Sequence, residues 1–265
     1  NSSMFYLNRS KMILAIFVTL LTNLIPSISL AQSKAEQILN KLDNHYYYPQ
    51  NKGLIRISSQ LDWEQESIIS EEKITIKKSA FIFEGQLNDK TFEKKVKPAS
   101  STKNTSSEKI TQDIVFLNNY LDMFLPKTLR EKFVRHKGKI DSRIGSETKL
   151  LFKKIEPIED FNDYELFIEE KKWRISKVIV RQNKEPKKME GEFIYSQKDG
   201  KWVVDETLSV YKINGKEYIE KTKYKYTKSK SIWLVNKINQ SIEQDGHTIL
   251  SYKFKLNDHK LKLKH

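Results

Sequence analysis

The chain has 265 residues, no cysteine, and a formal net charge of +14 from 48 basic and 34 acidic residues. Without cysteine there is no disulfide framework, thiol nucleophile, thiolate metal site or lipidated cysteine, so stability must come from packing. The positive charge favours anionic partners, whereas the preference for lysine over arginine argues against bidentate recognition of nucleic-acid bases.

The first 31 residues have the pattern of a secretory signal peptide. Two basic residues precede an apolar run from Ile13 to Leu21, and small residues before Gln32 suit cleavage. A membrane anchor is the alternative, but polar residues and a proline interrupt the run short of about 20 apolar residues. We therefore expect residues 1–31 to be a signal peptide, and residues 32–265 to form one domain in the periplasm or cell envelope of a bacterium.

A helix is predicted to begin directly after this cleavage site. Ser33 and Glu36 have the spacing of a capping box, in which each side chain accepts a hydrogen bond from the other residue's backbone N–H. Apolar residues then recur on one helical face as far as Tyr46. We expect the helix to end within Tyr46–Tyr48, before Pro49.

The period changes to two after Gly53, which predicts β-strands. A long strand carries Ile55, Ile57, Leu61 and Trp63 on one side, and a pair of strands follows, the first with Ile74 and Ile76 and the second with Phe81 and Phe83 sharing a face. The stretch from Lys94 to Ser107 has no periodic apolar residues and is rich in polar residues, so we expect a flexible loop at 94–107.

A strongly apolar helix is predicted from Ile110 to Phe124, ending before Pro126, with a short helix around Leu129 and Phe133. The remaining chain predicts short strands joined by tight turns, three of them marked by Asp-Gly or Asn-Gly pairs. Short connections between alternating strands indicate an antiparallel meander. The predicted strands span Thr148–Ile155, Tyr164–Glu169, Ile175–Arg181, Glu192–Gln197, Trp202–Tyr211, Tyr218–Tyr226, Ile232–Ile238 and Thr248–Leu256.

Two of the later strands separate aromatic from basic side chains. Tyr224 lies opposite in face to Lys223 and Lys225, and Tyr252 and Phe254 alternate with lysines in the same way. A sheet of about ten such strands is too large to stay flat. The predicted fold class is therefore mainly β (α+β), with a curled antiparallel sheet that forms a half-barrel and helices that cover its concave apolar face.

Motifs for catalysis and cofactors are missing from the sequence. Neither GxGxxG nor GxxxxGK[ST] occurs, the five histidines are dispersed, and adjacent carboxylates on a strand point to opposite faces. We therefore expect no catalytic residue, no cofactor and no metal site. Tyrosines and lysines lie on opposite faces, which separates a stacking platform from its charge and argues against single-stranded nucleic acid as a partner.

The opening of the expected mature chain, Ala35-Glu36-Gln37-Ile38-Leu39-Asn40-Lys41-Leu42-Asp43, resembles the first helix of the LolA-like outer-membrane lipoprotein-sorting family. The order of elements that follows is similar as well. The resemblance implies a half-barrel whose apolar concavity holds lipid or lipoprotein acyl chains, with a membrane surface or an outer-membrane acceptor as a further partner. The positive charge and the 94–107 stretch depart from the family, and no residue position carries over.

The leading hypothesis is therefore a non-enzymatic carrier or binder of lipid or of lipid-modified protein. The alternative is a cell-envelope adaptor or structural module that binds an anionic surface or a protein through its lysine-rich strands, and a hydrolase using dispersed carboxylates is a third reading. Face alternation gives the candidate ligand-binding residues, which are Ile55, Ile57, Leu61, Trp63, Phe81, Phe83, Tyr224, Tyr252 and Phe254.

Overall fold

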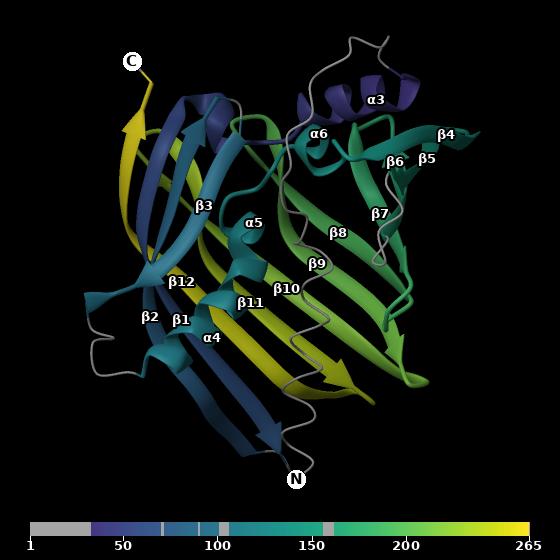
Figure 1. The fold of residues 1–265 in the computed structure, drawn as a ribbon. Coiled ribbons are helices and arrows are strands. Elements are labelled where there is room, and N and C mark those ends of the chain that lie inside the picture. The colour runs from purple at the N-terminus through teal and green to yellow at the C-terminus, as the bar shows by residue number, and fades with distance from the viewer. Residues whose placement is uncertain (1–32, 70–71, 90, 101–105, 156–161, 265) are drawn as a thin grey trace. The chain divides into compact units, whose positions relative to one another are not determined.

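The computed structural model describes residues 33–69, 72–89, 91–100, 106–155 and 162–264. The expected signal peptide lies outside these residues. Twelve antiparallel strands form one sheet in the order β3-β2-β1-β12-β11-β10-β9-β8-β7-β6-β5-β4, which is open because β3 and β4 lie at its two ends (Figure 1). The predicted fold class, a curled antiparallel sheet with helices over its apolar face, is confirmed.

The order of helices and strands follows the prediction, except that β3 and β4 were not expected as strands and the expected pair after the first strand is one strand. The strands are β1 (Leu54–Ile69), β2 (Glu72–Asn88), β3 (Thr91–Pro98), β4 (His136–Ile144), β5 (Glu147–Lys154), β6 (Asn162–Glu169), β7 (Arg174–Gln182), β8 (Lys188–Lys198), β9 (Lys201–Ile213), β10 (Lys216–Ser229), β11 (Ile232–Gln244) and β12 (His247–Leu263). The helices are α3 (Lys34–Asp43), η1 (Pro49–Lys52), α4 (Ser107–Leu117), η3 (Asn118–Tyr120), α5 (Leu121–Phe124) and α6 (Leu129–Lys132). Among the described helices, none is both long and apolar enough to span a bilayer.

The chain divides into two compact units. The described part of unit 1 comprises residues 48–69, 72–89, 91–100, 106–127 and 222–264. In this unit β12 pairs with β1 on one side and with β11 on the other, so the end of the chain lies beside its first strand. The helical segment α4–η3–α5 lies across the apolar face of these strands (Figure 1).

The described part of unit 2 comprises residues 33–47, 128–155 and 162–221, and β5 and β6 contribute to its core. Phe133, which follows α6, stacks on Phe152 with ring centroids 4.4 Å apart and meets Tyr164 edge-on at 5.2 Å. Asp43 at the end of α3 accepts hydrogen bonds from the first two backbone N–H groups of α6, at 2.8 and 3.1 Å. Through this cap, α3 and α6 stabilise each other.

The N-terminal capping box is confirmed, and the end of the helix is corrected. The Ser33 N–H donates to Glu36 Oε2 at 2.8 Å, and the Glu36 N–H donates to Ser33 Oγ at 3.2 Å. The helix ends at Asp43 and not within the tyrosines. Tyr46 instead forms a parallel bridge with Trp202, whose backbone offers hydrogen bonds that a longer helix would forgo.

Two strand predictions are also corrected. The expected pair of strands around Ile74 and Phe81 is one continuous strand, β2. The predicted loop 94–107 is strand from Lys94 to Pro98, because β3 pairs with β2 along its whole length. Its lysines lie at a sheet edge, where Val96 is the single buried position, so the usual apolar alternation is missing. Residues 101–105 lie outside the described residues, and α4 begins at Ser107.

The Asp-Gly and Asn-Gly turns are confirmed as hairpin turns. Both central residues have positive φ at Asp199-Gly200 (49° and 75°), at Asn214-Gly215 (50° and 77°) and at Asp245-Gly246 (52° and 78°). This backbone matches the right-handed twist of the paired strands, which explains why these residue pairs occur at the β8–β9, β9–β10 and β11–β12 connections.

Candidate functional site

Seven of the nine predicted ligand-binding residues lie together on one face of the sheet in unit 1. The register of β1 places Leu61 opposite Leu256 and Phe81, and Trp63 opposite Phe254, so side chains from three neighbouring strands point to one side. Each of the seven is at most 2% exposed. We call this set the aromatic face, and it consists of Ile57, Leu61, Trp63, Phe81, Phe83, Tyr252 and Phe254.

The other two predicted residues do not share this burial. Ile55 is partly exposed, while its neighbour Leu54 is fully buried. A register shift between Leu54 and Arg56 in the pairing of β1 with β12 interrupts the alternation at this point. Tyr224 on β10 is partly exposed too.

A helical segment fills the space over the aromatic face. We call residues 107–125 the cover. Phe116 stacks on Trp63 with ring centroids 4.6 Å apart, Tyr120 lies 4.4 Å from Phe254, and Phe124 meets Phe83 edge-on at 5.5 Å. The cover occupies this face with its own aromatic rings, so the face is a packed core in the described conformation.

The cover is a broken structure. Its α-helical parts, α4 and α5, are separated by the single 3-10 turn η3, and α5 has only four residues. Helices this short have little stability of their own, because nucleation is costly and few hydrogen bonds follow. The cover is therefore held mainly by what it contacts on the sheet.

Polar contacts tie the cover to β2 and β3. The ammonium of Lys94, whose side chain is 4% exposed, forms an ion pair with Asp122 and donates to the Leu125 carbonyl at 2.7 Å. Lys127 approaches the other oxygen of Asp122 at 3.4 Å. Ser79 donates to the buried carboxylate of Asp113 at 3.4 Å. A buried ion pair is costly to break from one side, so Lys94 acts as a latch on the cover.

Three hydrogen-bonded polar side chains also lie within the core of unit 1. The Tyr120 hydroxyl donates to Gln240 Oε1 at 3.1 Å, and Gln240 Nε2 donates to Thr222 Oγ1 at 3.0 Å. All three side chains are buried, so each hydrogen bond avoids the cost of a desolvated polar group. If the cover leaves, Gln240 and Thr222 become a polar anchor on an otherwise apolar surface.

Sequence reasoning missed the latch and the polar anchor. Lys94 falls in a stretch predicted as loop, and nothing in the sequence separates it from its neighbour Lys95. Gln240 shares its strand face with Ile238 and Ile242 and could have been recognised as a polar residue on an inward face, whereas Thr222 lies between two lysines and shows no such signal. Their pairing with Tyr120 depends on a contact 120 residues apart in the chain.

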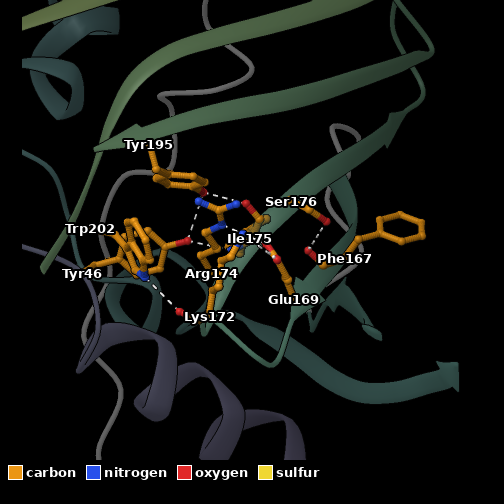
Figure 2. A network of polar contacts seen from close by, with 9 residues as sticks. All are labelled: Tyr46, Phe167, Glu169, Lys172, Arg174, Ile175, Ser176, Tyr195 and Trp202. Atoms are coloured by element: carbon orange, nitrogen blue, oxygen red, sulfur yellow. Dashed lines mark hydrogen bonds and ion pairs between the residues drawn. The ribbon is translucent and has the colours of Figure 1, made fainter. Parts of the chain in front are cut away.

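A second polar network lies in unit 2, around the end of α3 (Figure 2). Tyr195 donates its hydroxyl hydrogen to the Ile175 carbonyl at 2.7 Å, so Tyr46, 3.0 Å away, donates to the Tyr195 oxygen. The Ile175 N–H in turn donates to Tyr46 at 2.8 Å. Burial raises the pKa of Tyr46 to about 12, so the hydroxyl keeps its proton. The network joins α3 to β7 and β8.

Burial also shifts the pKa of two further side chains in unit 2. Burial lowers the pKa of His136 to about 4, and the ring packs edge-on between Phe133 and Tyr164. Burial raises the pKa of Glu220 to about 7. In the part of the chain that the structure describes, no group of three histidine or carboxylate side chains is placed to hold a metal ion.

Comparison with known proteins concerns the fold. No family model and no curated protein sequence matches the chain. Among solved structures it is similar to a LolA superfamily protein from Nitrosomonas europaea, with 8% identity, 87% of this chain and 94% of that chain covered, and a TM-score of 0.36. It is also similar to a DUF1329 family protein from Desulfovibrio piger, with 8% identity, coverage of 87% and 94%, and a TM-score of 0.34.

A third similar structure is a candidate outer membrane lipoprotein-sorting protein domain from Vibrio parahaemolyticus, with 11% identity, coverage of 85% and 91%, and a TM-score of 0.31. The LolA-like resemblance stays an expectation from the first helix and the order of elements, because each of these TM-scores lies below 0.5. Likeness at this level of identity and TM-score says nothing of a ligand or a partner, which must be argued from the residues of this chain.

Proposed function

We propose that the protein is an exported, non-enzymatic carrier or binder of lipid or of lipid-modified protein, and that acyl chains bind to the aromatic face. The observation that carries this proposal is the way the face is covered. A large aromatic surface on three strands is closed by a short, broken helical segment with a polar latch at one end. The basic and apolar regions at the start of the sequence support a place in the periplasm or cell envelope.

The exchange of the cover for an acyl chain is close to balanced in free energy. Burying one methylene is worth about 0.8 kcal/mol, so an acyl chain of about sixteen carbons gains roughly 12 kcal/mol. The cover buries five large apolar side chains, each worth roughly 2 kcal/mol, or about 10 kcal/mol together. A ligand of this class therefore competes with the cover, whereas a small polar ligand does not. The five are Phe116, Leu117, Tyr120, Phe124 and Leu125.

The polar anchor indicates where a lipid would be oriented. An acyl chain attached to glycerol or to a protein carries an ester or amide group beside its first methylene. Gln240 and Thr222 lose Tyr120 as a partner when the cover leaves, and together they offer both donor and acceptor atoms. Gln240 Oε1, which accepts from Tyr120 in the covered state, then needs a new donor. An amide N–H or a hydroxyl beside the acyl chain supplies one, so the proposed ligand is an acyl chain with a hydrogen-bond donor at its polar end.

The first test is native mass spectrometry, with organic extraction, on the chain from Gln32 purified without detergent from a bacterial periplasm. We expect a phospholipid or an acylated species to be retained. A clean mass that stays unchanged after incubation with phospholipid vesicles would overturn the carrier function.

The latch allows a sharper test of where the lipid binds. Lys94→Met removes the ion pair with Asp122 but keeps every aromatic contact of the cover. We expect uptake of a fluorescent fatty acid to be about tenfold faster than in the unmodified chain, which corresponds to about 1.4 kcal/mol on the opening of the cover. The matched control is Lys95→Met, because Lys95 is exposed on the same strand and is 3.8 Å from Glu84. Equal rates in both variants would place the ligand elsewhere.

A cell-envelope adaptor remains the second candidate, and exposed lysines favour it. Lys223, Lys225 and Lys255 in unit 1 are exposed, whereas Lys253 is paired with Glu64 and Glu66 at 3.3 and 2.9 Å. Binding through such lysines weakens as salt is added, because exposed charges are screened beyond about 10 Å at 0.1 M salt. Acyl-chain burial does not weaken in this way. Titration of vesicle binding against sodium chloride therefore separates the two functions.

A further inference from the structure

Three chain segments meet at one end of unit 2. They are the end of α3, the turn between β6 and β7, and the turn between β8 and β9. The Lys41 ammonium lies 3.7 Å from the centre of the Trp173 ring. Trp202 Nε1 donates to the Lys172 carbonyl at 2.9 Å, and Lys201 donates to the carbonyl of Asn44.

We call the aromatic and basic side chains gathered there the turn patch. It consists of Lys41, Lys171, Trp173, Arg174, Lys201 and Trp202. Lys41 and Lys171 are exposed, and both tryptophans are partly exposed. Figure 2 shows Trp202 beside Arg174 and Tyr195 at this end of unit 2.

The backbone at Trp173 is unusual. Its φ is 50°, in the left-handed region, where a bulky side chain is uncommon and where glycine or asparagine is favoured. A residue held in such a conformation is often found where it serves a function. The turn therefore presents an indole ring at a position that local backbone preference would give to a smaller residue.

The cations of the turn patch lie against its aromatic rings. The Arg174 guanidinium lies 5.0 Å from the centre of the Trp202 ring and 5.5 Å from that of Tyr195, and its Nε is 2.9 Å from Glu169 Oε2. Among the described residues, no carboxylate forms an ion pair with Lys41, Lys171 or Lys201. Their charge is available to an anionic partner.

We propose that the turn patch docks on an anionic lipid bilayer, with the two indoles at the level of the headgroups and the lysines on lipid phosphates. Indole rings are favoured at membrane interfaces because they combine an apolar body with an N–H donor. Basic side chains are attracted to the negative surface of such membranes. The patch carries both features at one end of unit 2. A bilayer surface matches the indoles and the charges at once, whereas an acidic protein segment matches only the charges. This docking is independent of acyl-chain binding in unit 1.

The test is co-sedimentation of the chain from Gln32 with vesicles of equal parts phosphatidylglycerol and phosphatidylcholine, compared with vesicles of phosphatidylcholine alone. We expect at least tenfold stronger partitioning to the anionic vesicles. The double variant Lys41→Glu/Lys171→Glu should lose at least tenfold. The matched control is Lys260→Glu/Lys262→Glu, which makes the same change in net charge on exposed lysines of unit 1 and should bind within twofold of the unmodified chain.

Quenching by brominated lipid reports whether the indoles reach the bilayer. The chain has four tryptophans, and we expect their emission to be quenched on binding. The quenching should be lost in Trp173→Phe/Trp202→Phe, which keeps Trp63 and Trp233. Circular dichroism of each variant controls for folding, and the tryptophan pair tests the proposal independently of the lysines.

Three results would overturn the proposal. Equal losses in the two lysine pairs would show attraction to net charge alone. Binding without quenching would exclude the indoles from the interface. Binding to soluble polyglutamate but not to anionic vesicles would identify an acidic protein surface as the partner. Lipid retained by the protein in the vesicle-free supernatant measures the carrier function, whereas co-sedimentation measures docking of the turn patch. Failure of either proposal therefore does not decide the other.

Discussion

Glu220 on β10 is a buried carboxyl group, and burial raises its pKa to about 7. In the unfolded chain the same group titrates near 4.5. Because the folded pKa is the higher one, the stabilising contribution of the protonated group is fully present below pH 4.5 and is lost as the pH rises to 7. The loss amounts to about 3 kcal/mol above pH 7.

Glu220→Gln should therefore remove a pH dependence. Glutamine keeps the shape of the protonated acid but cannot ionise. We expect the variant to be about 3 kcal/mol more stable than the unmodified chain at pH 8, and close to it at pH 4. Urea unfolding of both chains at pH 4 and pH 8 gives their free energies of unfolding. The gain of the variant at each pH value follows from these. Glu217→Gln is the control, because Glu217 is exposed on the same strand. An equal gain at both pH values would contradict the buried titration.

At the scale of elements, the β4–β5 pair depends on a glycine. Gly138 lies opposite Phe152, and a Cβ atom at Gly138 would lie 2.4 Å from the Phe152 ring. We expect Gly138→Ala to cost about 2 kcal/mol, because the ring or the strand must move. Gly145→Ala is the matched control, with φ of 59° and no atom within 4 Å. It should cost about 1 kcal/mol through the backbone alone.

A second substitution tests whether the ring is the cause. In the Gly138→Ala background, Phe152→Leu should cost less than it does in the unmodified chain, because the two side chains compete for one space. Thermal or urea unfolding of the four chains of this cycle gives the coupling. Strict additivity would show that Gly138 is required for a reason other than its contact with Phe152.

Elements with regular alternation were predictable, and elements held by distant contacts were not. The capping box at Ser33, the three hairpin turns and the buried side of β1 and β12 follow from residue spacing. The early end of α3 depends on Trp202, which lies far along the chain. β3 owes its strand structure to pairing with β2, because its own sequence has the composition of a loop.

The candidate site shows the same division. Burial of the aromatic face follows from strand alternation, but whether the face is open or covered depends on how the cover packs. A local shift at Leu54 was enough to remove Ile55 from the buried row. The latch and the polar anchor are pairings between single side chains on distant elements, and one sequence contains no signal for such pairs.

At the scale of the whole molecule, β12 is the strand on which unit 1 depends. It lies between β1 and β11 and contributes Tyr252 and Phe254 to the aromatic face. A chain that ends after Gly246 should lose hydrogen-exchange protection throughout β1 and β2, while β5, β6 and β7 in unit 2 keep theirs. The control is a chain that ends after Leu263 and retains all of β12. Protection of β1 without β12 would show that the β1–β2 pair is stable alone.

The pairing of Leu54 with Leu263 also sets an order of events during biosynthesis. β1 leaves the ribosome long before its partner β12, because the two strands are far apart in the sequence. Contacts so far apart in sequence form slowly, because a long loop must close first. Until then β1 and β2 hold an unshielded row of tryptophan, phenylalanine and leucine, a surface prone to aggregation. The aromatic face is thus completed only after β12 has been made, and until then the nascent chain exposes it to wrong contacts.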